Sequence, residues 1–137
     1  MENIMKGKRG LIMGVANDHS IAWGIAKTLH KYGAEMAFTY QDEAFGKRLR
    51  PLAETIGAKQ VMQCDASKEE DLDRVFADLK KDWGSIDFVV HAIAFSNKDE
   101  LKGHYVDTSL ANFLTSMHVS CFSFTSVARR AKDRFKA

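Results

Sequence analysis

The sequence predicts an α/β protein in which helices cover both faces of a doubly wound parallel sheet, giving three layers. Two observations support this fold class. Short apolar segments alternate with amphipathic segments of about ten to fifteen residues, which is the pattern of repeated βα units. The apolar segments are nearly continuous, as expected for parallel strands buried on both faces. Right-handed crossovers then place the helices on the sheet.

Composition limits the class of protein further. The chain has 137 residues, of which 45% are hydrophobic and 28% charged, so we expect one ordinary globular domain over residues 1–137. The net charge of +2 gives no reason to expect a nucleic-acid partner. No apolar run approaches the roughly 18 residues of a membrane span. Cys64 and Cys121 lack the spacing of metal ligands or of a disulfide framework, so we expect no metal site and a reducing cytoplasm.

Strands and helices are expected in strict alternation. The strands are residues 9–13, 36–40, 60–64 and 86–92; the helices are residues 21–32 and 44–56, the segment between Ser67 and Gly84, and residues 109–134, after a loop at about 94–108.

The first two helices are predicted from their apolar faces and their ends. Ile21, Ile25 and Leu29 recur at helical spacing and are expected to face the core. Gly33 follows them, and glycine commonly supplies the left-handed residue that ends a helix. Pro51 lies inside the second helix, where it predicts a kink or a later start.

The third helix has the clearest amphipathic pattern. Residues 65–67 (Asp-Ala-Ser) are expected to cap it, and Gly84 to end it. Its buried face is formed by Leu72, Val75, Phe76 and Leu79. The fourth strand is apolar except for Asp87 and His91. We expect His91 to be a hydrogen-bonded structural group.

The loop after the first strand carries the main functional pattern. The strand ends at Gly14, a polar loop follows, and Ser20 stands where the next helix begins. Such a junction presents backbone N–H groups and a helix N-terminus to a phosphate. Ser20 is the expected N-cap, and its hydroxyl could also reach a phosphate oxygen. The spacing G-x-G-x-x-G is absent, because Gly14 and Gly24 are ten residues apart, so this loop alone is weak evidence.

Taken together, the four strand ends predict a binding crevice. Ligands of such sheets bind beyond the carboxyl ends of the strands. The residues at these ends are Gly14 with Ser20 and Ile21, Gln41, Asp65 with Ala66, and Ile93. A dinucleotide is long enough to use all four positions, so the sequence predicts a Rossmann-type dinucleotide-binding domain. Taken singly, Asp65 could be only a helix N-cap and Ile93 only a core residue.

The residues after the second strand favour NAD over NADP. A 2′-phosphate is usually met by arginine or lysine. Residues 40–43 (Tyr-Gln-Asp-Glu) offer an amide and two carboxylates, and the first cations are Lys47 and Arg48 on the following helix.

These residues resemble the N-terminal half of the bacterial enoyl-acyl-carrier-protein (ACP) reductases, a divergent branch of the short-chain dehydrogenases/reductases. The resemblance covers nearly the whole chain and is carried by residues 14–16, 20–26, 33–35, 37–41, 63–65, 87–91, 93–95, 103–107 and 122–124. It implies contacts to NAD from Gly14, Ser20, Ile21, Asp65, Ala66 and Ile93, with Gln41 near the adenosine. It also implies that Ser96 lies where the backbone meets the acyl substrate.

The resemblance implies an activity and its partners. The activity is NADH-dependent reduction of the 2,3-double bond of enoyl-ACP in fatty acid biosynthesis, by a homotetramer. The family's catalytic Tyr-x6-Lys pair follows a fifth strand, so the resemblance implies that the catalytic residues lie beyond Ala137. It also implies that this sheet is truncated after its fourth strand and the helix that follows. Tyr40 and Lys47 have the same spacing, but they follow the second strand, on the adenine side of the crevice.

Alternatives remain open at this stage. One is a non-catalytic dinucleotide-binding module, because the chain lacks the tyrosine and lysine at the expected place. Another is a different short-chain reductase, such as a ketoacyl reductase, which would be expected to show T-G-x-x-x-G-x-G in the first loop. Flavodoxin-like and methyltransferase folds would also explain alternating βα units, but they do not explain all four crevice positions.

Overall fold

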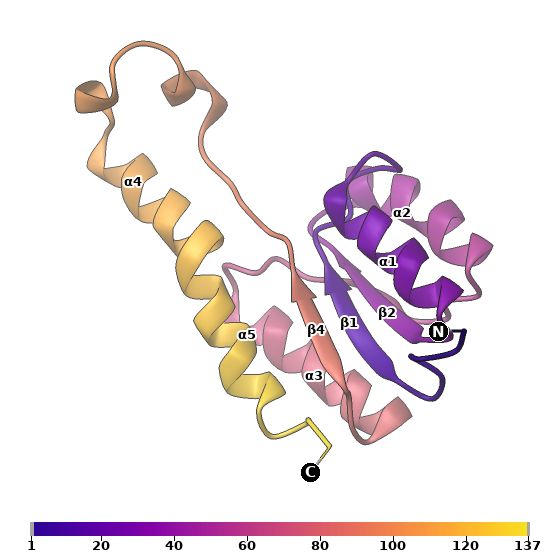
Figure 1. Ribbon diagram of the computed structural model, residues 1–137. Helices are drawn as coiled ribbons and strands as arrows, with labels where there is room; N and C mark the ends of the chain where they lie inside the picture. Colours follow the sequence, from indigo (N-terminus) through magenta and orange to yellow (C-terminus); the bar gives the residue numbers. More distant parts are fainter. Residues whose placement is uncertain (1, 137) are drawn as a thin grey trace.

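The computed structural model describes residues 2–136 and confirms the predicted α/β class (Figure 1). Four parallel strands form one sheet in the order β3-β2-β1-β4. The strands are β1 (Arg9–Met13), β2 (Glu35–Tyr40), β3 (Val61–Gln63) and β4 (Phe88–His91). The helices are α1 (Ile21–Lys31), α2 (Glu43–Thr55), α3 (Glu69–Trp83), α4 (Leu110–Met117) and α5 (Ser123–Ala131).

Helices cover both faces of the sheet, as predicted. Helices α1 and α2 lie on one face, and α3 and α5 lie on the other (Figure 1). Because neighbouring strand residues point to opposite faces, Leu11 and Met13 pack with the α3 and α5 side chains, whereas Ile12 packs with those of α1 and α2. The four apolar α3 side chains named above are all buried. Within residues 2–136, no helix is long and apolar enough to cross a bilayer.

Two details of the α1 and α2 units differ from the sequence prediction. The Ile21 side chain is 83% exposed, and α1 packs instead through Ala22, Trp23 and Ala26. Helix α2 begins at Glu43 and continues through Pro51, so the predicted late start is wrong. Its N-cap is Asp42, whose carboxylate accepts hydrogen bonds from the amides of Ala44 and Phe45, and this cap stabilises the start of the helix.

The predicted cap of α3 is also wrong. The helix begins at Glu69 and its N-cap residue is Lys68, with no side-chain cap. Asp65 Oδ1 instead accepts hydrogen bonds from the amide and the hydroxyl of Ser67, at 2.9 and 2.6 Å. These bonds close a turn before the helix, as Asp side chains commonly do. Gly84 does end α3, with φ 75°.

The single helix expected at 109–134 is interrupted by a π-helical segment, η3 (His118–Phe122), between α4 and α5. Ser109 caps α4 through the amide of Asn112. Two hydroxyl groups here bond the end of β4 and the segment after it. Ser120, within the π turn, bonds both the N–H and the C=O of Phe95, and Ser123, the first residue of α5, bonds His91. Such π-helical segments are common at functional sites, and sequence periodicity carries no signal for them.

Candidate functional site

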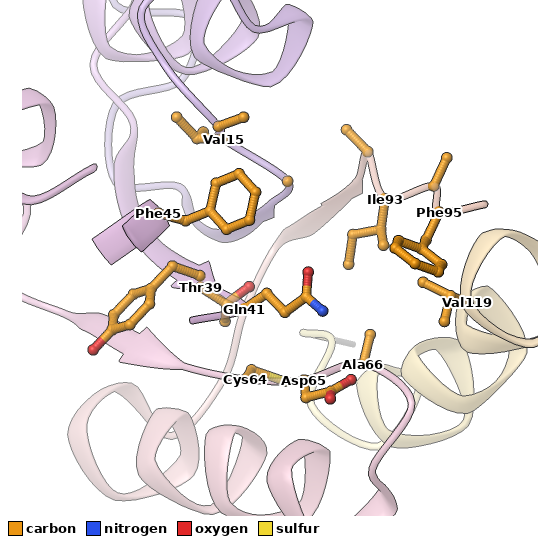
Figure 2. A pocket seen from close by; sticks show the side chains of 15 residues that line it. Val15, Thr39, Gln41, Phe45, Cys64, Asp65, Ala66, Ile93, Phe95 and Val119 are labelled. Carbon is orange, nitrogen blue, oxygen red and sulfur yellow. The ribbon is translucent and has the colours of Figure 1, made fainter. Parts of the chain in front are cut away.

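A cleft of about 660 Å³, open to solvent, lies at the carboxyl ends of the strands (Figure 2). The structure brings five of the predicted site residues together in its lining: Gly14, Gln41, Asp65, Ala66 and Ile93. They come from the ends of four different strands. The predicted crevice therefore exists, and contact with a cofactor remains a prediction.

Gly14 ends β1 with φ 107°, in the region that favours glycine. The loop that follows is held by Ser20, whose Oγ accepts hydrogen bonds from the amides of Ala16 and Asn17 at 2.9 and 3.0 Å. Ser20 occupies the N-cap position of α1 but makes no side-chain bond to the helix. The expected capping bond is therefore wrong, because the loop folds back and uses the hydroxyl itself.

This loop geometry leaves the start of α1 available to an anion. The amides of Ile21 and Ala22 find no acceptor within residues 2–136, whereas those of Trp23 and Gly24 bond the Ser20 carbonyl. Unpaired N–H groups at a helix N-terminus form a site for phosphate. Ser20 and Ile21 are not part of the cleft lining itself. They sit at its border, and what Ile21 offers is its backbone N–H, since its side chain is exposed.

The opposite side of the cleft is polar. Figure 2 shows the side chains of Gln41 and Asp65 at the cleft. Asp65 Oδ1 is occupied by Ser67, and Asp65 Oδ2 has no hydrogen-bond partner among the described residues. A carboxylate oxygen in this position can accept a bond from an amino group of a ligand.

Sequence reasoning missed several lining residues. They are apolar or buried, and include Val15, Thr39, Phe45, Cys64, Phe95 and Val119. Burial raises the pKa of the Cys64 thiol to about 12, so it stays protonated and acts as an apolar wall. The strand-end pattern did not point to Phe45, because it lies within α2. It did not point to Val119 either, because this residue reaches the cleft from η3, 28 residues beyond the end of β4.

The β4 end of the site is fixed by His91. Its Nε2 lies 2.8 Å from Ser123 Oγ, and Ser123 Oγ donates to the Val119 carbonyl at 2.6 Å. Because the hydroxyl proton is used there, His91 Nε2 is assigned as the donor. Burial lowers the pKa of His91. The predicted structural role of His91 is therefore confirmed.

Ser96 lies outside this cleft, in a neighbouring hollow beneath the loop before α4. Its Oγ accepts a hydrogen bond of 3.2 Å from Asn112 Nδ2. Asn112 is buried and its Oδ1 accepts from the amide of Asn97. The backbone around Ser96 is thus anchored to α4.

Several charged side chains at the end of β2 and the start of α2 have partners. Arg50 bonds Glu43 and donates to the Tyr40 hydroxyl at 2.9 Å, so Tyr40 is engaged with Arg50 and not with Lys47. Arg48 stacks over the ring of Phe45, 5.6 Å from its centroid. Within residues 2–136, no three His, Cys, Asp or Glu side chains are grouped so that they could hold a metal ion.

Comparison with known proteins agrees with this geometry. The family model for enoyl-(acyl carrier protein) reductase matches residues 14–137. An NADH-dependent enoyl-(acyl-carrier-protein) reductase of Rhizobium meliloti is 56% identical over 133 residues, which are 97% of this chain and 50% of the relative. The chain spans about half the length of the curated relatives it matches.

Solved structures give the same result. The crystal structure of enoyl-(acyl-carrier-protein) reductase from Anaplasma phagocytophilum in complex with NAD is 57% identical, with a TM-score of 0.93 over 98% of this chain and 52% of that chain. The enzyme of Bacillus cereus, solved with NADP⁺ and an indole naphthyridinone, is 45% identical, with a TM-score of 0.93 over 98% of this chain and 53% of that chain.

Proposed function

Because the chain belongs to the enoyl-(acyl carrier protein) reductase family, we propose that it forms the cofactor-binding half of an NADH-dependent enzyme that reduces the 2,3-double bond of enoyl-ACP in fatty acid biosynthesis. One observation carries the proposal. The ends of all four strands supply residues to a single cleft, which is where doubly wound sheets bind dinucleotides. The alternative of a ketoacyl reductase loses support, since both the family model and the relatives are enoyl reductases.

The residues fit the cofactor in three places. Gly14 and the free amides of Ile21 and Ala22 suit the pyrophosphate. Asp65 Oδ2 suits the adenine amino group, with Gln41 beside it and Ala66 packing against the rings. Ile93, held by the His91 anchor, suits the nicotinamide end. When bound, NADH supplies the hydride, and the part of these residues is to hold and orient it.

The remaining assignments concern the substrate and the assembly. We place the acyl thioester beside Ser96, where the Asn112 bond supports the backbone. A homotetramer is supported by the apolar side chains exposed along 110–124, among them Leu110, Leu114, Phe122 and Phe124. A cytoplasmic location is supported by the two free cysteines. The net charge gives no support to a nucleic-acid partner.

Oxidation of NADH by crotonyl-ACP tests the proposal. Residues 1–137 alone are compared with the same chain extended through a segment that carries the family's Tyr-x6-Lys pair. We expect turnover only from the extended chain, because loss of one group that stabilises transition-state charge costs about 100- to 1,000-fold. Comparable turnover by residues 1–137 alone would move the chemistry into this chain and bring Tyr40 and Lys47 back into consideration. NADH binding without turnover by the extended chain would favour the non-catalytic module.

A further inference from the structure

A hydrogen-bond network centred on Arg74 lies behind the adenine side of the cleft. Arg74 is in the second turn of α3. Its guanidinium donates to Asp71 Oδ1 at 3.1 Å, to the Gln63 carbonyl at 2.8 Å and to Gln63 Oε1 at 3.0 Å. One arginine therefore fixes both a carboxylate on its own helix and the last residue of β3.

Both ends of this network reach the cleft backbone. Asp71 Oδ2 accepts a hydrogen bond of 2.8 Å from the amide of Asp65. Gln63 Nε2 donates one of 2.8 Å to the carbonyl of Gln41. Gln41 and Asp65 are the two residues proposed to meet the adenosine, so the network ties together the two segments that carry them.

Backbone pairing does not extend far enough to do this. Strand β3 pairs with β2 over three residues only, ending at Tyr40 and Gln63. The last backbone bond joins the amide of Cys64 to the carbonyl of Tyr40 at 2.8 Å. Beyond it, the Gln63 side chain makes the one hydrogen bond between the two segments in the described part of the chain.

Asp71 is the buried member of this network. Asp71 is 7% exposed, and a buried carboxylate must be fully paired. The Asp65 amide and the Arg74 guanidinium hold the pKa of Asp71 below its usual value, although burial acts in the opposite direction. Its bond goes to a residue six positions earlier and not to an amide of α3, so it orients the loop rather than capping the helix.

We infer that Arg74, acting through Asp71 and Gln63, is a positioning residue that sets the spacing between Gln41 and Asp65 for the adenosine half of the cofactor. The inference rests on the proposed function. Arg74 touches no ligand itself. The Arg74 side chain is half exposed, so we assign its effect to the geometry of the cleft wall and not to the strength of the ion pair with Asp71.

The test uses the full-length enzyme, with Arg74→Gln as the variant and Lys80→Gln as the control. Lys80 is an exposed cation on the same helix and forms no ion pair within residues 2–136. We expect Arg74→Gln to raise the KM for NADH and the inhibition constant of ADP-ribose about fivefold, as for one lost hydrogen bond. The kcat should be unchanged, because the nicotinamide end is not touched. Lys80→Gln should change neither constant.

A second variant covers the case in which Arg74→Gln fails to fold. Gln63→Met, at an exposed position, removes the bond to the Gln41 carbonyl and the one that Gln63 Oε1 accepts from Arg74. It leaves the Asp71–Arg74 pair and the bond from Arg74 to the Gln63 carbonyl intact, and we expect the same rise in the KM for NADH and in the inhibition constant of ADP-ribose. Unchanged ADP-ribose inhibition in folded variants, with only a lower melting temperature, overturns the inference and leaves the proposed function standing. A wild-type enzyme that binds neither NADH nor ADP-ribose overturns both.

Discussion

Gly14 lies directly against the carbonyl group of Ala92, so that a Cβ added at Gly14 would overlap the Ala92 oxygen. The two residues directly follow the neighbouring strands β1 and β4, and the amide of Ala92 bonds the carbonyl of Met13 at 3.0 Å. The close approach brings the loop before α1 and the segment after β4 together at the cleft. It leaves no room for a side chain at position 14.

Gly14→Ala is predicted to destabilise the fold. Alanine would meet the Ala92 carbonyl and would have to adopt φ 107°, so we expect a loss of more than about 1 kcal/mol in the free energy of unfolding. Gly24→Ala is the matched control. Gly24 is helical with nothing within 4 Å of an added Cβ, and alanine there should stabilise by about 0.5–1 kcal/mol. Urea unfolding measures both, and a neutral Gly14→Ala would contradict the close approach.

Ser20→Ala is predicted to weaken NADH binding about fivefold, or about 1 kcal/mol. The change removes the acceptor of the Ala16 and Asn17 amides, so the loop before α1 should lose its fixed shape. Ser20→Thr keeps the hydroxyl and should bind NADH nearly as the wild type does. Calorimetric titration of NADH into the folded wild type and variants measures their dissociation constants. An unchanged dissociation constant in Ser20→Ala would restrict Ser20 to a role in stability.

Asp65→Ala is predicted to weaken binding of the adenine half while leaving α3 intact, because Asp65 does not cap that helix. Some stability is lost with the Ser67 turn. Ser67→Ala, which removes the hydroxyl bond but keeps the carboxylate, separates the two effects. If ADP-ribose affinity falls in Asp65→Ala and not in Ser67→Ala, the carboxylate meets the ligand. A loss confined to melting temperature would leave it with the turn alone.

The protein is predicted to bind NADH more tightly than NADPH. Glu43 holds Arg50, and residues 40–43 carry no cation. One candidate for a 2′-phosphate is Arg48, whose guanidinium lies over the ring of Phe45, a residue of the cleft lining. Titration of both cofactors measures the preference. Equal or tighter NADPH binding would refute it, and Arg48→Ala would then show whether Arg48 supplies the contact.

Stability is predicted to fall in mildly acidic solution because of His91. Burial lowers the pKa of His91 in the folded protein below its ordinary value of about 6.5, so the unfolded chain takes up a proton first as the pH falls. The free energy of unfolding should therefore decrease from about pH 6.5 down to the lowered folded pKa. His91→Gln should remove this part of the pH dependence. Identical pH profiles for the two proteins would contradict the assignment.

Local sequence was sufficient for the order and type of the main elements and for the crevice. Apolar runs placed all four strands, and Gly33 and Gly84 ended their helices as expected. Because the carboxyl ends of parallel strands meet at one edge of the sheet, the residues after the strands could be predicted to share one cleft. Gly14, Gln41, Asp65 and Ile93 do so.

Only the tertiary structure decided which partners the polar side chains take. Ser20 and Asp65 looked like helix caps, but each bonds its own loop. The π-helical turn at 118–122 and the Arg74 network likewise leave no trace in periodicity. Periodicity reports which face of an element is buried, and that is local. A hydrogen bond also needs the distance and direction of a second group, and these are fixed only when segments remote in the sequence are packed together.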